Sequence, residues 1–135
     1  MRLLHTSDWH LGKKFEDIDL LPQQEAFADQ LINIVRDQKV DAVLVAGDIY
    51  DRSTPNAEAV SLADDIFARL IREGVQVIAI SGNHDSAERL RFGSAAMAEA
   101  GLHIRAEHRL VSAMGMPITV TSRDGRESVQ VVPVP

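Results

Sequence analysis

Three short stretches of the sequence combine aspartate, histidine and asparagine in a way that suits metal-assisted chemistry. They are SDWHLG at residues 7–12, AGDIYDRSTP at residues 46–55 and SGNHDS at residues 81–86. Carboxylate, imidazole and amide groups bind divalent cations, and a bound cation can activate water and stabilise a leaving oxygen. Because the chain has no cysteine, oxygen and nitrogen atoms must supply every ligand.

Each stretch also has an ordinary structural interpretation. Asp8 is suited to capping a turn, and the dipeptides at residues 47–48 and 82–83 are common in loops. Considered singly, each stretch is more often structural than functional, because short motifs have a high false-positive rate. The functional interpretation therefore depends on whether the fold brings the three stretches together.

The predicted elements place all three stretches at one edge of a sheet. Apolar runs at Leu3–Ser7, Ala42–Ala46 and Val75–Ser81 predict strands buried on both faces. Helical spacing of apolar residues predicts helices over Pro22–Lys39 and Asn56–Gly74 between them. Alternating strands and helices build a parallel sheet, and ligands bind at the carboxyl ends of its strands, where the three stretches begin.

Five side chains are therefore candidates for one site at this edge: Asp8, His10, Asp48, Asn83 and His84. In extended geometry Asp8 and His10 would leave the same side of the backbone and could hold one ion. A purely structural interpretation would have to explain three coincidences at a single sheet edge. A metal site is the favoured interpretation.

The last third of the chain predicts one more helix and three more strands. A helix is predicted over Ser86–Ala100, with Gly93 as a weak point inside it. Leu102–Ala106 is a candidate fourth strand of the sheet. Ile118–Ser122 and Val129–Val134 predict a hairpin.

Composition limits the class of protein. With 135 residues, of which 45% are hydrophobic and 25% charged, the chain fits one soluble globular domain. No apolar run is long enough for a transmembrane span or a signal-peptide core, so we expect a cytoplasmic protein with no membrane partner. The net charge of -6 argues against a broad phosphate-binding surface, so contact with nucleic acid would depend on cations or on a partner.

In this order and at these strand ends, the three stretches resemble the first three motifs of the calcineurin-like metallophosphoesterases: DxH, GDxxD and GNH followed by Asp or Glu. The Leu-Gly after His10 and the continuation GDIYDRSTP look most like the Mre11/SbcD nucleases, in particular the bacterial SbcD type. The resemblance extends over about residues 1–100. It implies an α/β fold, the αββα metallophosphoesterase sandwich with a central, mostly parallel sheet and flanking helices, truncated in this chain.

The resemblance also implies the roles of the five candidates. Asp8 and His10 would hold the first of two divalent metals. Asp48 would bridge both metals, and Asn83 would bind the second. His84 would face the scissile phosphate and assist the leaving oxygen. Manganese is the metal that the resemblance implies, while the ligand types also suit iron or zinc.

Other polar residues near the motifs receive smaller roles. Asp51 and Asp85 either support the site, where a carboxylate can orient an imidazole, or cap loops. Trp9 is expected to pack beneath its loop. His5 is interpreted as a core histidine, and His103 and His108 as surface residues. Five basic residues are interpreted as solvated charges rather than phosphate contacts: Lys13, Lys14, Arg52, Arg89 and Arg91.

The family completes its site with three downstream histidines, one alone and two in a GHxH motif, and neither motif occurs in this sequence. We therefore expect residues 1–135 to be the N-terminal part of the nuclease domain, without the rest of the domain or a downstream capping region. Alone, such a fragment would bind metal weakly or bind a single ion, mainly through Asp8, His10 and Asp48. It would have little or no nuclease activity.

For the whole protein, the resemblance implies a manganese-dependent DNA exonuclease and endonuclease that acts in recombination and in processing double-strand breaks and hairpins. The implied partners are DNA, an SMC-like ATPase of the SbcC type, and a second copy bound through helices over residues 56–73 and 86–100. A metallophosphatase or cyclic-nucleotide phosphodiesterase with the same motifs is one alternative. A noncatalytic scaffold is the other.

Overall fold

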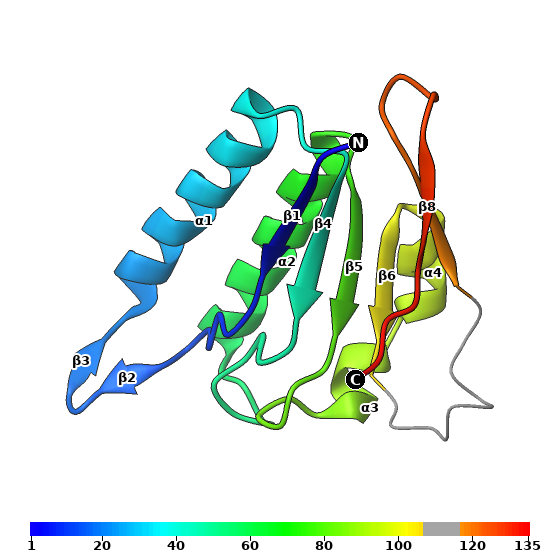
Figure 1. Ribbon diagram of the computed structural model, residues 1–135. Coiled ribbons are helices and arrows are strands. Elements are labelled where there is room, and N and C mark those ends of the chain that lie inside the picture. Colours follow the sequence, from blue (N-terminus) through cyan, green and yellow to red (C-terminus); the bar gives the residue numbers. More distant parts are fainter. Residues whose placement is uncertain (107–116) are drawn as a thin grey trace.

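A four-stranded parallel sheet forms the centre of the protein, in a computed structural model that describes residues 1–106 and 117–135. The strands lie in the order β1 (Leu3–Thr6), β4 (Ala42–Ala46), β5 (Gln76–Ile80) and β6 (Leu102–Arg105). Their carboxyl ends all face the same edge, as Figure 1 shows. The predicted parallel sheet and its fourth strand are confirmed.

The strands differ in burial because of their places in the sheet. β4 and β5 lie in the middle, and Val43 and Val77 are fully buried. β1 lies at the edge, and there the prediction of a strand buried on both faces is wrong. Leu3 and His5 lie on the face opposite the helices, next to Ala42 and Leu44 of β4, and they are exposed because this face is covered only in part, so His5 is not a core histidine.

Two long helices cover one face of the sheet. Helix α1 (Leu21–Asp37) has Pro22 in its first turn, where the missing N–H of proline costs nothing. Helix α2 (Ala57–Arg72) begins after Asn56, whose side chain accepts a hydrogen bond from the backbone N–H of Ala59. Both helices lie close to the predicted ranges, and their apolar residues form one core with the strands, including Leu31, Val35, Ile66 and Leu70.

The helix predicted over Ser86–Ala100 is wrong as a single element. Two short helices replace it, α3 (Ala87–Arg91) and α4 (Ser94–Glu99). Gly93 between them has a φ of 74°, in the left-handed region that a continuous helix does not contain. The glycine that weakens the pattern is therefore the point where the chain turns.

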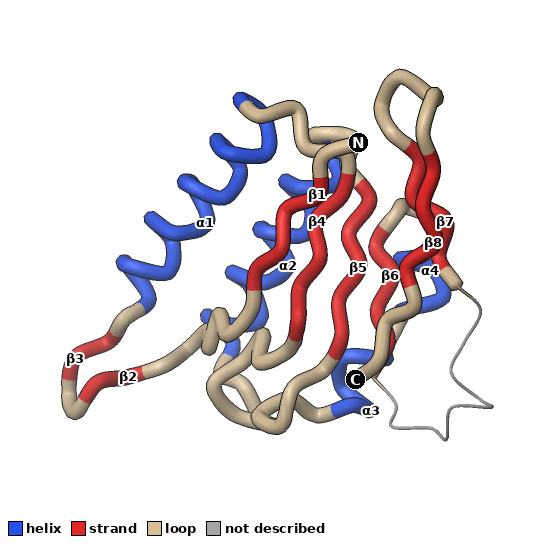
Figure 2. The backbone as a smooth tube through the Cα atoms, in the orientation of Figure 1, coloured by secondary structure: helices blue, strands red, loops and turns tan. Residues whose placement is uncertain are grey.

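The predicted hairpin is present, and it covers part of the opposite face of the sheet. Its strands β7 (Ile118–Thr121) and β8 (Ser128–Val131) pair antiparallel. Ile118 and Val120 pack against buried residues of the central sheet, and Figure 2 shows the hairpin in front of the sheet while α2 lies behind it. The structure is thus an α/β layer with helices on one face and a hairpin on part of the other.

A small ribbon that the sequence analysis did not predict follows the first motif. Its strands β2 (Lys14–Phe15) and β3 (Ile18–Asp19) project from the sheet edge, with Phe15 and Ile18 exposed. Among the described residues, no helix is both long and apolar enough to cross a membrane.

Candidate metal centre

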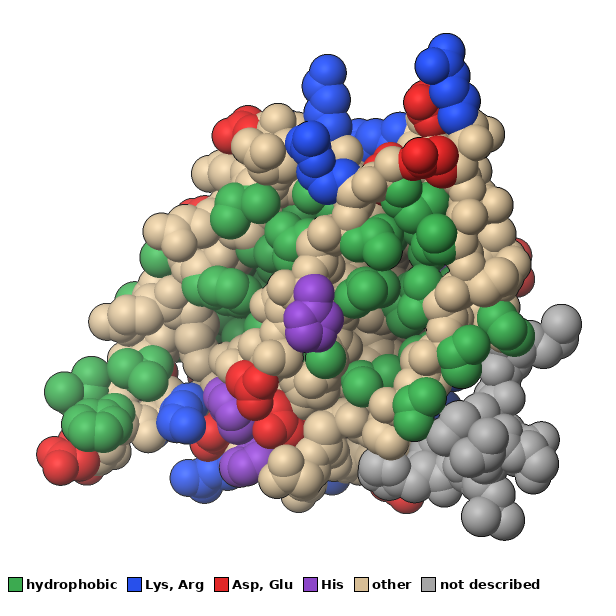
Figure 3. Space-filling model, in the orientation of Figure 1, with side chains coloured by type: hydrophobic (Ala, Val, Ile, Leu, Met, Phe, Trp, Pro, Cys, Tyr) green, Lys and Arg blue, Asp and Glu red, His purple; other side chains and the backbone are tan. Residues whose placement is uncertain are grey.

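The loops after β1, β4 and β5 meet at the carboxyl edge of the sheet. His10, Asp48 and His84, one from each loop, have potential ligand atoms that all lie within 4.8 Å of one another. Figure 3 shows histidine and acidic side chains gathered together beneath the strand ends. Three of the five predicted candidates therefore form one cluster, and Asp8 joins it through His10.

His10 lies between two carboxylates. Its Nε2 atom is 3.9 Å from Asp8 Oδ1 and 3.8 Å from Asp48 Oδ2. Both distances are too long for hydrogen bonds. Two ligand atoms that each lie about 2.1 Å from one ion are about 3 to 4 Å apart, so the separations suit ligands of a shared cation.

The other ring nitrogen of His10 supports the same interpretation. Nδ1 is buried and makes no hydrogen bond within the described part of the chain. The carboxylate of Asp51 lies beside it, with Oδ1 at 3.4 Å from Nδ1. A partly buried imidazole whose Nδ1 has no hydrogen-bond partner among the described residues, with carboxylates near both ring nitrogens, fits a divalent cation on Nε2 and a supporting carboxylate on Nδ1.

The backbone at the site is left-handed rather than extended. Asp8 has a φ of 55°, His10 a φ of 44° and Asp48 a φ of 49°. The expectation that Asp8 and His10 share a side of an extended strand is therefore wrong. They come together because the chain turns sharply at each of them, in a conformation that is uncommon for non-glycine residues and is often found at functional sites.

Asp48 connects the second and third loops. Its Oδ1 atom accepts a hydrogen bond of 2.9 Å from the backbone N–H of His84. His84 Nδ1 lies 2.8 Å from the carbonyl oxygen of Asp51. A carbonyl can only accept, so Nδ1 carries the proton and Nε2 of His84 remains available to a ligand or substrate.

Asp85 takes the second of its two expected roles, that of capping loops. Its carboxylate accepts hydrogen bonds from the backbone N–H groups of Ile49 at 3.1 Å, Tyr50 at 2.9 Å and Gly82 at 2.9 Å. It therefore fixes the backbone of the second and third loops. Gly82 itself is required here, because a Cβ at this position would overlap Asp48 Oδ1.

Asn83 and the basic residues lie around the cluster. Asn83 follows Gly82 on the third loop, and its side chain is exposed. Lys13 Nζ lies 3.8 Å from Asp51 Oδ1, and Arg52 Nε lies 3.9 Å from Asp51 Oδ2. Both basic side chains are exposed, as expected of solvated charges, and so are two further ones, Lys14 and Arg89.

Trp9 packs into the core as predicted. It is 6% exposed, contacts the rings of Phe27 and Phe67, and donates from Nε1 to Thr6 Oγ1. His103, expected at the surface, is partly buried, and burial together with Arg105 lowers its pKa. His108 lies outside the described residues.

Sequence reasoning missed Gln24, which contacts the first loop from α1. Its side chain is buried and bonds to backbone groups of Trp9, His10 and Gly12. The signal was a polar residue on the stripe of α1 that otherwise carries buried apolar residues: Ala28, Leu31, Ile32 and Val35.

Comparison with known proteins agrees with the geometry. The model of the calcineurin-like phosphoesterase family matches residues 1–116. The chain is 35% identical over 125 residues to the SbcD component of nuclease SbcCD from Staphylococcus saprophyticus, covering 92% of this chain and 32% of that protein. It is 40% identical over 105 residues to the protein of the same name from Bacillus subtilis, covering 77% and 27%.

A third relative matches the whole chain. The SbcD component of nuclease SbcCD from Escherichia coli K12 is 34% identical over 135 residues, which is 100% of this chain and 32% of that protein. The chain thus spans about a third of the length of the curated relatives it matches.

Proposed function

The chain belongs to the calcineurin-like phosphoesterases, and on this premise we propose that it is the N-terminal part of an SbcD-type nuclease that hydrolyses phosphodiester bonds in DNA. The family uses divalent metals. The observation that carries the proposal is the cluster of His10, Asp48 and His84 at the ends of three neighbouring strands. Three relatives are named as nuclease SbcCD subunits, which directs the proposal to nucleic acid, and the resemblance of the motifs to the SbcD type directs it to DNA.

The proposed ligands follow from position and chemical type. Asp8 and His10 would hold one metal, with Asp48 shared between two metals and Asn83 directed to the second. Bound metals would supply Lewis-acid stabilisation of the phosphate and a water of lowered pKa, and manganese suits these hard oxygen and imidazole ligands. Asp51 would hold the imidazole of His10 in orientation, since it lies 3.4 Å from Nδ1.

His84 is the proposed catalytic residue. Its Nδ1 proton is committed to the carbonyl of Asp51, and this bond fixes the ring so that Nε2 remains available to a substrate. The His84 side chain is exposed, as a group that meets a substrate must be. In this position Nε2, when the ring carries a second proton, would donate a hydrogen bond to the scissile phosphate and pass that proton to the leaving oxygen.

The second face of the sheet supports the proposal that residues 1–135 are one part of a larger domain. Figure 3 looks onto this face and shows many apolar side chains at its surface. Leu3 is 42% exposed and Val132 is 51% exposed. We propose that the second half of an αββα sandwich covers this face, supplies the downstream histidines of the site, and restores an activity that residues 1–135 lack alone.

The proposed macromolecular partners are DNA, an ATPase of the SbcC type and a second copy of the chain. The relatives are named as one subunit of nuclease SbcCD, which supports a partner of the SbcC type. The surface between α2 and the α3–α4 segment supports the second copy. There Phe92 is 84% exposed and Val60 is 46% exposed, beside a cavity of about 290 Å³.

A direct comparison of substrates tests the function. The full-length protein, with manganese, should degrade labelled duplex and hairpin DNA far faster than it hydrolyses bis(p-nitrophenyl) phosphate, and His84→Gln should abolish the DNA reaction while metal binding persists. Faster turnover of the small phosphodiester would indicate a small-molecule phosphodiesterase instead. Absence of hydrolysis and of metal binding would indicate a noncatalytic scaffold.

A further inference from the structure

Gln24 is a buried amide that reaches the first loop from the adjacent helix. It is 9% exposed and lies in the first two turns of α1. Its Nε2 atom donates to the carbonyl of His10 at 2.7 Å and lies 3.4 Å from the carbonyl of Trp9. Its Oε1 atom accepts the N–H of Gly12 at 3.0 Å. One side chain thus satisfies polar groups on both sides of Leu11.

These contacts hold a stretch of backbone that turns repeatedly. His10 has a φ of 44° and Gly12 a φ of 83°, both in the left-handed region. Such a turn exposes carbonyl and amide groups that no regular ladder can satisfy, so each needs a specific partner. The amide of Gln24 provides one donor and one acceptor in the positions that this turn requires.

The first loop is held from two sides. On one side, the N–H groups of His10 and Leu11 bond to the carbonyls of Asp48 and Ile49, at 2.9 Å each. These bonds fix where the first loop lies relative to the second loop. On the other side, Gln24 bonds to the carbonyl of His10. The peptide group before the His10 Cα is therefore held by Asp48. The peptide group after it is held by Ile49, by Gln24 and by the backbone N–H of Lys13, which donates to the His10 carbonyl at 3.0 Å.

We propose that Gln24 is a positioning residue for the metal centre. By fixing the left-handed backbone of His10, it sets the direction of the imidazole, whose Nε2 faces Asp8 and Asp48. The inference rests on the proposed role of His10 as a metal ligand. It adds that helix α1, although it contains none of the family motifs, takes part in setting metal affinity.

Two substitutions in the full-length protein test this role. Gln24→Met keeps the length of the side chain but removes both hydrogen-bonding groups. Gln24→Glu keeps the acceptor for the N–H of Gly12 but replaces the donor to the carbonyl of His10 with an oxygen. Gln30→Met is the matched control, because Gln30 is an exposed glutamine of the same helix.

We expect both Gln24 variants to bind manganese roughly 10- to 100-fold more weakly than the wild type in titrations followed by electron paramagnetic resonance, the usual effect of losing a partner behind a ligand. The absorption spectrum of bound cobalt should change, because the imidazole meets the ion at a different angle. In the metal-free protein, hydrogen exchange of the Gly12 amide should accelerate in Gln24→Met and less in Gln24→Glu. The Gln30→Met control should match the wild type in all three measurements.

Unchanged manganese affinity and an unchanged cobalt spectrum in both Gln24 variants would overturn the inference, even if the melting temperature fell. Failure of both variants to fold would also count against it, because Gln24 would then serve the fold as a whole. Failure of the proposed function looks different: the wild type itself would bind no manganese. A wild type that binds manganese and cleaves DNA, with Gln24 variants that bind equally well, would reject only the role of Gln24.

Discussion

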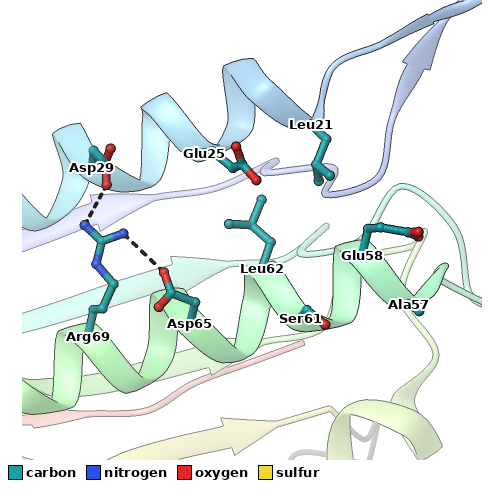
Figure 4. A pocket seen from close by; sticks show the side chains of 9 residues that line it. All are labelled: Leu21, Glu25, Asp29, Ala57, Glu58, Ser61, Leu62, Asp65 and Arg69. Carbon is teal, nitrogen blue, oxygen red and sulfur yellow. Dashed lines mark hydrogen bonds and ion pairs between the residues drawn. The ribbon is translucent and has the colours of Figure 1, made fainter.

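The groove between α1 and α2 and the carboxyl edge of the sheet are both rich in carboxylates, but they use them in different ways. The groove encloses about 610 Å³ and contains four acidic residues: Glu25, Asp29, Glu58 and Asp65. Arg69 lies among them and binds Asp29 at 2.7 Å and Asp65 at 3.2 Å, as Figure 4 shows. Charge in the groove is thus partly neutralised by the protein itself.

At the sheet edge, backbone amides and imidazoles replace the arginine. Asp85 receives three backbone N–H groups, and Asp48 is buried beside His10 and His84. The groove carboxylates project from regular helices into solvent, where screening weakens their field. From this comparison we expect the proposed cation site to depend on a buried carboxylate, Asp48, held by a sharply turned loop, rather than on the number of negative charges alone.

The largest expected effect comes from neutralising one carboxylate in each region. Asp48→Asn should reduce manganese affinity and DNA hydrolysis of the full-length protein by more than roughly 100-fold, because the proposed shared ligand loses its charge. Loss of a residue that only supports a ligand costs up to about 100-fold. Asp65→Asn should leave manganese affinity and hydrolysis nearly unchanged. Titration with manganese and a gel assay of DNA cleavage measure the two effects. Equal losses in the two variants would mean that the regions do not differ as described.

A second pair of substitutions compares how tightly the backbone is packed at a glycine of the sheet edge and at a glycine after α2. Gly82→Ala places a Cβ against Asp48 Oδ1 and the Asp48 backbone, so we expect a loss of about 2–3 kcal/mol in the free energy of unfolding. At Gly74, at the end of α2, an added Cβ would face open space, and only the positive φ of 75° opposes the substitution. We therefore expect Gly74→Ala to lower the free energy of unfolding by about 1 kcal/mol. Urea unfolding distinguishes the two values, and a Gly82 variant as stable as the Gly74 variant would contradict the tight packing.

Sequence patterns predicted the parts of the fold in which local and global signals agree. Apolar runs located the four parallel strands, and Asn56 and Pro22 marked the starts of the long helices. The prediction of a single helix over residues 86–100 was wrong because the apolar periodicity does not show that Gly93 adopts a left-handed conformation. His5 was placed in the core because strand composition does not reveal whether both faces of an edge strand are covered.

For the candidate site, the sequence predicted which residues converge but not how they are held. The positions of the motifs at three strand ends were sufficient to predict that His10, Asp48 and His84 lie close together. Neither the left-handed backbone at His10 nor the contact from Gln24 could be predicted, since both depend on the packing of α1 against the loop. The sequence left two roles open for Asp85, because a carboxylate next to a histidine can serve either an imidazole or the backbone.

A smaller effect is expected from removing the charge that balances the groove. Arg69→Met leaves Asp29 and Asp65 without their partner, but both carboxylates are at least half exposed. Exposed ion pairs contribute little, so we expect the free energy of unfolding to fall by no more than about 1 kcal/mol and manganese affinity to stay unchanged. A stability loss of several kcal/mol in urea unfolding would show that the groove is as strongly constrained as the sheet edge.

The smallest expected effect on stability comes from the ion pair between Arg36 of α1 and Glu73 at the C-terminal end of α2, and this effect should depend on pH. Arg36 donates to Glu73 from Nε at 3.1 Å, and this hydrogen bond lowers the pKa of Glu73. Because the folded protein holds this carboxyl below its unfolded pKa of about 4.3, the unfolded chain binds more protons in acid. The stabilisation by Glu73 is therefore present above that pH and is lost as the pH falls through the lowered value. Wild type and Glu73→Gln should differ slightly in melting temperature at pH 7, and the two should converge as the pH falls through the lowered pKa of Glu73. A difference that persists unchanged into acid would mean that the pair contributes through packing of its side chains and not through charge.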